Sequence, residues 1–311
     1  MRAVNFCSHV YREDYDMDTL LKNKKTILLL VLPGLCIFVF AVILPIILSI
    51  YYGMTEWSGI GNPIFIGMAN YKEIIFHDKT FWISLRNALI LGLAFVFIQH
   101  PVCLLFAILL DRIGGKMERV FKTIFFIPCV ISIVVTSKMW VSIYDPQYGI
   151  LNKLLDVLHL SNLKQQWLGD PKFSLVSIII ILMWQGFGWG MLIYHAGLKS
   201  IPNQLYEAAK IDGAGGFKMF KKITYPLMKP IIRINVTLAI ISALKQMETV
   251  YLTTNGGPGN SSQFLANYLY IKAFNSYEYG YGNAISVLFV IICLICMLCL
   301  NKILKSENYE Y

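Results

Sequence analysis

The sequence predicts an all-α membrane protein with six transmembrane helices and both termini in the cytoplasm. The first indication is the composition of the 311-residue chain, which is 57% hydrophobic and only 14% charged. About a quarter of the residues of a soluble domain are charged. The second indication is a series of long uncharged runs, and the third is the uneven distribution of Lys and Arg among the segments between those runs.

Four uncharged runs are long enough to cross a membrane. They cover residues 26–55, 87–110, 173–198 and 279–301. About 20 apolar residues cross the roughly 30 Å of hydrocarbon in a bilayer, so each run predicts one spanning helix. The first run is too long for the core of a signal peptide, and no small-residue cleavage site follows it. We therefore expect it to remain in the mature protein.

Two further runs are interrupted by charges. Residues 123–144 contain Lys138, and residues 234–251 contain Lys245 and Glu248. In a soluble protein such runs would be core helices, but this chain has no large soluble domain in which to bury them. Counting both as spans gives a six-helix membrane domain over 26–303, between an N-terminal tail, 1–25, and a C-terminal tail, 304–311.

Lys and Arg set the expected orientation. If the N-terminus is cytoplasmic, the inside segments hold 17 of these residues and the outside segments hold 6. Cytoplasmic loops carry an excess of Lys and Arg, so both ends are predicted to lie inside. This asymmetry also accounts for the net charge of +9, and no nucleic-acid partner is needed to explain it.

The motifs of soluble enzymes do not occur in the sequence. It has no Walker-type phosphate loop, no H-E-x-x-H and no G-x-S-x-G. The histidines are scattered, and we interpret His100 and His195 as structural, packed residues. The cysteines imply no disulfide framework. We therefore predict no catalytic site, no metal site and no cofactor bound by this chain.

The long inside segment between spans four and five has an ordered pattern. Residues 207–210 favour a helix, and Gly213 begins a glycine-rich stretch that would end it. A second helical pattern starts at Phe217, so the segment predicts helix, turn, helix. Its small residues would permit close approach by a partner protein. An amphipathic helix anchored to lipid headgroups through its lysines explains the same pattern equally well.

This segment resembles the EAA loop of permease subunits in bacterial ABC importers. The residues that carry the resemblance are Glu207, Ala208, Ala209, Asp212, Gly213, Phe220, Ile223 and Pro226. One departure from the family pattern is Tyr225, where Leu is usual. Further along, residues 252–254 and the Gly-Gly-Pro-Gly stretch 256–259 resemble a segment of carbohydrate-importer permeases of the maltose and glycerol-phosphate type.

The resemblance covers about residues 25–303, and it implies a fold, a function and partners. The fold is the type I permease fold of ABC importers, in the cytoplasmic membrane of a bacterium. Segment 203–226 would couple the chain to a separate ATPase dimer, which uses the ATP. A second, related but non-identical permease and an extracytoplasmic solute-binding protein would complete the transporter. The function implied is ATP-driven import of a sugar or oligosaccharide by alternating access.

The substrate path is predicted along spans four and five. Three glycines at alternate positions, 186, 188 and 190, weaken a helix, which predicts a kink or local unwinding in span four of the kind that transporters use for binding. Six residues are the candidates for this path: Trp184, Gln185, Trp189, Lys245, Gln246 and Glu248. An aromatic ring and amide groups suit a sugar, and Lys245 could pair with Glu248 three residues on. Close packing through the glycines is the structural alternative.

Two other functions are compatible with parts of the sequence. Import of a different solute, such as a phosphorylated glycerol or a polyamine, would use the same architecture. An intramembrane enzyme or a channel would place reactive or charged groups inside spans. The charges predicted inside spans here are few and form no nucleophile–base pair, which makes this class the remoter alternative.

Overall fold

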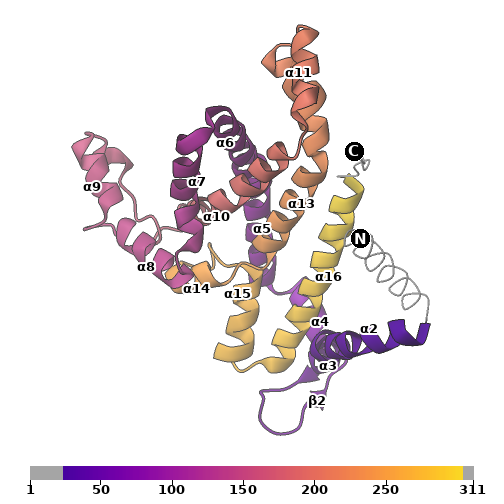
Figure 1. The fold of residues 1–311 in the computed structure, drawn as a ribbon. Coiled ribbons are helices and arrows are strands. Elements are labelled where there is room, and N and C mark those ends of the chain that lie inside the picture. Colours follow the sequence, from indigo (N-terminus) through magenta and orange to yellow (C-terminus); the bar gives the residue numbers. More distant parts are fainter. Residues whose placement is uncertain (1–23, 304–311) are drawn as a thin grey trace, which may run out of the picture.

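The computed structural model describes residues 24–303 as a set of long helices joined by short ones (Figure 1). In the labels that follow, η marks a 3-10 or π segment. The elements in chain order are α2 (Lys24–Phe38), η1 (Val39–Ile43), α3 (Leu44–Gly53), β1 (Thr55–Glu56), β2 (Ile64–Phe65), α4 (Ala69–Phe76), α5 (Lys79–Ala94), η2 (Phe95–Gln99), α6 (His100–Ile113), α7 (Gly115–Val130), α8 (Ile133–Ile143), α9 (Ile150–Val157), η3 (Ser161–Leu163), α10 (Ser174–Lys199), α11 (Asn203–Ile211), α12 (Gly216–Met219), η4 (Phe220–Thr224), α13 (Tyr225–Leu244), α14 (Glu248–Thr253), α15 (Leu265–Tyr270), η5 (Ile271–Asn275) and α16 (Tyr279–Ile303). The predicted tails lie outside the described residues, except for the first two residues of α2.

The all-helical prediction is confirmed, and within residues 24–303 its exception is one two-stranded antiparallel ribbon, β1–β2. Within the described part of the chain, five helices are long and apolar enough to span a membrane, and a bent pair brings the number to six. The five are Ile27–Gly53, Lys79–Ile113, Ser174–Lys199, Gly216–Leu244 and Tyr279–Lys302.

The third predicted span is bent rather than straight. α7 and α8 meet at an angle of 94°. Between them Ile131 takes an extended backbone conformation, with φ −67° and ψ 134°, and Ser132 does the same. Pro128 lies in the last turn of α7, where proline weakens the helical hydrogen-bond ladder. α8 and α9 consequently project to one side of the bundle (Figure 1).

The fifth span starts and ends earlier than predicted. It runs from Gly216 to Leu244, so it begins inside the segment 203–226 that was predicted to couple the chain to an ATPase. The helix ends at Leu244, directly before Lys245, and a new helix, α14, starts at Glu248. The prediction that Lys245 and Glu248 lie three residues apart on one helix is therefore wrong, and the predicted pairing loses its basis. The apolar residues that resume at Val250 had suggested that one helix continues across this break.

Three of the π segments end two residues before a proline. η1, η2 and η4 are each followed by one residue and then by Pro45, Pro101 or Pro226. Proline lacks a backbone N–H and its ring crowds the preceding turn, and a single widened turn accommodates this without ending the helix. The spans therefore continue through their prolines.

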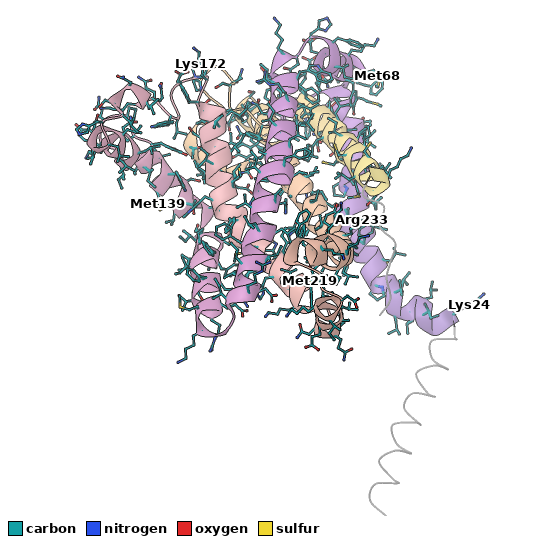
Figure 2. The ribbon with its side chains drawn as sticks, turned by 90° about the horizontal axis from the view of Figure 1, so that it is seen from above. Lys24, Met68, Met139, Lys172, Met219 and Arg233 are labelled. Carbon is teal, nitrogen blue, oxygen red and sulfur yellow. The ribbon has the colours of Figure 1, made fainter. Side chains whose placement is uncertain are left out.

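The two ends of the bundle correspond to the predicted inside and outside. In Figure 2, Met68 and Lys172 lie towards one end, whereas Lys24 and Met219 lie towards the other. The first pair belongs to segments predicted to be outside, and the second pair to segments predicted to be inside.

α10 occupies the centre of the bundle and packs against α6, α7 and α13. Two clusters of buried apolar side chains hold it there. One contains Ile178 and Leu182 of α10, and the other contains Met191 and Leu198. Both ends of this helix are thereby fixed, and the surface between the two clusters faces the cavity described next.

Candidate functional site

A cavity of about 580 Å³ lies between α10, α13, the bent pair α7–α8 and the junction of α5 with α6. Polar groups from distant parts of the chain meet at its wall. They are Gln99, His100, Gln185, Trp189, Asn235, Ser242 and Gln246. Apolar side chains and two glycines of α10 complete the lining. The site is therefore concave and mostly apolar, with a few convergent polar groups, as is usual for small-molecule sites.

Three of the six residues predicted for the substrate path line this cavity together. Gln185 and Trp189 enter from α10, and Gln246 enters from the turn after α13. Trp184 does not line it; its ring packs edge-on against Trp140, with centroids 5.5 Å apart. Lys245 and Glu248 are likewise not among the lining residues. The cavity thus contains three of the four uncharged residues of the prediction and neither of the two charged ones.

Sequence reasoning missed four polar residues of the wall. Gln99, Asn235 and Ser242 were not singled out, and His100 was interpreted only as a packed side chain. The histidine is indeed packed, since its Nδ1 lies 2.9 Å from the hydroxyl of Tyr194. The available signal was the presence of amide side chains inside apolar runs, because polar groups within spans are costly and tend to be functional.

Backbone carbonyls of α10 orient two of these amides. Gln99 donates to the carbonyl of Met183 at 3.3 Å, and Asn235 donates to that of Gly190 at 3.1 Å. Gln246 differs from both. Its side chain is 9% exposed, and its Nε2 has no hydrogen-bond partner among the described residues. A buried donor without a partner is costly, so this group is available to a ligand.

The glycines of α10 serve packing, and the local unwinding predicted there is wrong. α10 runs as an unbroken α-helix from Ser174 to Lys199. A Cβ on Gly188 would collide with the backbone carbonyl of Phe125 in α7. A Cβ on Gly186 would lie 3.1 Å from Nε2 of Gln99, and one on Gly190 would lie 3.2 Å from Sγ of Cys103. Neighbouring helices therefore approach α10 where it lacks side chains, and their contacts offset the intrinsic cost of glycine.

The coupling segment, 203–226, has the predicted helix–turn–helix form. α11 ends at Ile211, and Gly213 follows with φ +71°. The N–H of Ala214 donates to the carbonyl of Ala209 at 2.9 Å. This hydrogen bond spans five residues, and Gly213, just before its donor, has a left-handed backbone. Both features are usual where a glycine ends a helix. α12 begins at Gly216 and continues through η4 into the fifth span.

The surface of this segment combines charged groups of both signs, with more lysines than acids, and exposed apolar side chains. Glu207 and Asp212 are exposed, and so are Ile211 at 88% and Phe217 at 79%. The hydroxyls of Tyr206 and Thr224 lie 3.0 Å apart and tie α11 to η4. Three further motif residues are half-buried: Phe220, Ile223 and Pro226. The segment is therefore a stiff hairpin whose outer surface is free for a partner.

Residues 103–306 match the family described as the inner membrane component of binding-protein-dependent transport systems. The chain belongs to this family. It is an ABC transporter permease, a multi-pass membrane subunit of a transporter and not an enzyme. ATP hydrolysis and the binding of solute outside the membrane are functions of other components of such systems.

Several characterised or named relatives cover most of the chain. A probable ABC transporter permease of Pyrococcus horikoshii is 40% identical over 86% of this chain and 91% of its own length. The trehalose/maltose transport system permease protein of Thermococcus litoralis is 33% identical over 85% and 88%. A probable permease of Bacillus subtilis is 34% identical over 87% and 93%. The relatives come from both archaea and bacteria. They therefore support the predicted membrane location but do not identify the membrane as bacterial.

The fold has a close counterpart among solved structures. A chain of the bacterial alginate ABC transporter, crystallised with its alginate-loaded periplasmic protein, superimposes with a TM-score of 0.78. The superposition covers 95% of this chain and 99% of that one, at 22% sequence identity. At that identity the likeness establishes the ABC permease fold.

Proposed function

We propose that this permease carries a sugar or an oligosaccharide into the cell. Relatives at 30–33% identity are named for trehalose and maltose, for starch degradation products and for arabino-oligosaccharides. The transporter would contain a second permease, an ATPase dimer that binds and hydrolyses ATP, and an extracytoplasmic binding protein that delivers the sugar. ATP-driven closure of the ATPase dimer would switch the cavity between inward-open and outward-open states.

The chemistry of the cavity wall carries this proposal. Among the described residues that line it, none is Lys, Arg, Asp or Glu. Amides, a serine hydroxyl and the half-exposed indole of Trp189 are what a neutral, hydroxyl-rich ring needs for hydrogen bonds and stacking. A phosphorylated glycerol would call for cationic groups and a polyamine for carboxylates. The wall therefore favours the sugar over both alternatives.

Substitutions in the wall test the substrate path. Trp189→Ala and Gln246→Ala each remove a polar or aromatic contact, so we expect apparent sugar affinity to fall by about tenfold, the equivalent of 1.4 kcal/mol. The measurement is sugar uptake by the reconstituted transporter over a range of sugar concentrations. Trp82→Ala and Gln204→Ala are the matched controls, since both residues lie outside the cavity. Unchanged affinity in both wall variants would place the path elsewhere.

The coupling segment would dock on the ATPase. Its stiffness suits the transmission of a rigid-body motion, and Glu207 can form a charge-assisted hydrogen bond with a basic residue of the partner. Glu207→Ala should reduce the amount of ATPase that co-purifies with the permease. The control is Glu56→Ala, which removes an exposed carboxylate from β1 in a segment predicted to be outside. A lipid-anchoring role predicts instead that ATPase association survives loss of Glu207 and weakens when Lys218, Lys221 and Lys222 are neutralised.

The first span would pack against the second permease. All its described side chains from Ile27 to Leu48 are exposed in the single chain, so it buries its apolar surface only in lipid or against another subunit. We propose that the partner is a related, non-identical permease. Affinity purification through a tag on this chain, after co-expression with candidate partners, tests this. A stable, transport-competent complex that contains two copies of this chain would contradict it.

Binding-protein-dependent ATP hydrolysis across a panel of sugars tests the whole proposal. The assembled transporter should hydrolyse ATP faster in the presence of a sugar-loaded binding protein, and uptake should follow the same sugar. Stimulation by a polyamine or a phosphorylated glycerol, and by no sugar in the panel, would contradict it.

A further inference from the structure

A cluster of charged side chains ties three helices together beside the coupling segment. Glu118 of α7 lies at its centre. Its Oε1 is 2.6 Å from Nζ of Lys122 and 3.2 Å from Nε2 of His195, and its Oε2 is 3.9 Å from Nζ of Lys199. Lys199 in turn lies 2.8 Å from Oδ1 of Asp111 in α6. The cluster therefore joins the start of α7 to the ends of α6 and α10.

We propose that Glu118 and His195 are positioning residues that make α7 and α10 move as one unit when the ATPase drives the coupling segment. This inference rests on the proposed coupling function. Neither residue touches the cavity or the exposed surface of the hairpin. Their role is to hold the cytoplasmic end of one cavity-lining helix against the helix that leads into the coupling segment.

The contact is nearly buried, which sets it apart from an ordinary surface pair. The side chain of His195 is 5% exposed and that of Glu118 is 13% exposed. Surface ion pairs contribute little because water screens them, and here little water reaches either side chain. Lys122 lies on the same helix as Glu118, so it can satisfy the carboxylate but cannot connect α7 to α10. His195 and Lys199, both on α10, provide that connection, and Nε2 of His195 approaches Oε1 of Glu118 at 3.2 Å without the alignment of a hydrogen bond.

Two further contacts continue the connection towards the cavity. The backbone of Phe125 fits against Gly188, and the thiol of Cys129 donates to the carbonyl of Gln185 at 2.9 Å. Cys129 and Gln185 both line the cavity. α7 and α10 are thus joined at their cytoplasmic end, at mid-helix and at the cavity wall.

At this same cytoplasmic end α10 connects closely to the coupling helix. The N–H of Ser200 donates to carbonyls of the last turn of α10, and its hydroxyl donates to Gly197 at 2.7 Å. Ile201 is buried in the same apolar cluster as Leu198 and Met228. α11 starts two residues later, at Asn203. A displacement of α11 is therefore passed to α10, and through Glu118 to α7.

The inference predicts a loss of coupling without a loss of sugar affinity. In the assembled transporter in proteoliposomes, Glu118→Gln and His195→Leu should each lower the number of sugar molecules moved per ATP by about fivefold. The apparent affinity for the sugar, the amount of bound ATPase and the thermal midpoint should stay close to wild type. His195→Gln keeps a donor at this position and should retain most of the coupling. The double variant should lose no more than either single variant, because both act through one contact.

The molecule contains a matched control pair. Glu73 and His77 form a glutamate–histidine pair at 3.4 Å near the opposite end of the bundle, but their side chains are 60% and 70% exposed. Glu73→Gln should leave the ratio of sugar to ATP unchanged. If Glu207→Ala uncouples the transporter and Glu118→Gln and His195→Leu do not, the inference is wrong and the coupling function stands. If Glu207→Ala also leaves the ratio intact, the coupling function itself is wrong. Should Glu118→Gln fail to fold, the contrast between His195→Leu and His195→Gln decides the matter.

Discussion

Gly213 and Gly188 are both required by the structure, but for opposite reasons. Gly213 lies in open space, and no atom would touch a Cβ placed there, yet its φ of +71° favours glycine. Gly188 is an ordinary helical residue, yet a Cβ there would collide with Phe125. The coupling segment therefore depends on local backbone geometry, whereas the cavity wall depends on packing between distant helices.

This difference has consequences for how each region fails. A change at Gly213 should alter the shape of one exposed hairpin and leave the bundle intact. A change at Gly188 should separate α7 from α10 and disturb the bundle as a whole. The comparison can be tested by substitutions that affect only the backbone or only the packing.

Gly188→Val should have the largest effect. The added side chain meets the backbone of α7, which cannot move away as the end of a flexible side chain would. Overpacking of this kind costs about 1–3 kcal/mol, and we expect the upper end of that range. The thermal midpoint of the purified permease should fall by several degrees, measured by size-exclusion chromatography after heating. Gly215→Val is the control, because its Cβ would meet nothing and its φ is −70°. Equal midpoints for the two variants would contradict the packing argument.

Gly213→Val should have a smaller and more local effect. A β-branched residue in the left-handed region costs about 1–2 kcal/mol, and this strain is confined to the turn after α11. The thermal midpoint should stay at the wild-type value, while the ATPase retained on affinity purification should fall by about tenfold. Gly213→Asn should behave almost as wild type, since asparagine also ends helices in this conformation. The backbone argument would be refuted by an asparagine variant as damaging as the valine variant.

The smallest effect is expected where neither backbone nor packing is constrained. Lys164 donates to Asp156 on the exposed segment around α9, and this bond, with a second from Ser161, holds the pKa of Asp156 below its ordinary range. A depressed pKa contributes stability above about pH 4, the unfolded value, and that stability is lost as the pH falls through the folded value. Both groups are exposed, so Asp156→Asn should shift the thermal midpoint at pH 7 by no more than about 1 °C. A clear loss at pH 7 would show that this segment is stabilised by more than a surface contact.

The same contrast explains what could be predicted from the sequence. The helix–turn–helix of segment 203–226 is local, so its helix formers, its glycine turn and its motif residues predicted it in detail. The cavity brings together Gln99, Gln185 and Asn235, which are separated by at least 50 residues, and no local pattern records that proximity. The glycines of α10 could indicate either a flexible helix or close packing by a neighbour. The sequence does not distinguish these two possibilities, whereas the positions of the neighbouring helices do. The break after Leu244 was missed because Lys245 and Glu248 were interpreted as interruptions within a span whose apolar residues resume at Val250.

Access to the cavity in the two states of the transporter tests the central claim most directly. Ser242 lines the cavity and is exposed, so Ser242→Cys, in a background without the seven native cysteines, reports which side of the membrane reaches it. A membrane-impermeant maleimide should label this cysteine from the cytoplasmic side in the absence of nucleotide. With ATP, vanadate and the sugar-loaded binding protein, labelling should occur from the external side only. Lys172→Cys, on an external segment, should be labelled from outside in both states. Labelling of Ser242→Cys from the same side in both states would contradict alternating access through this cavity.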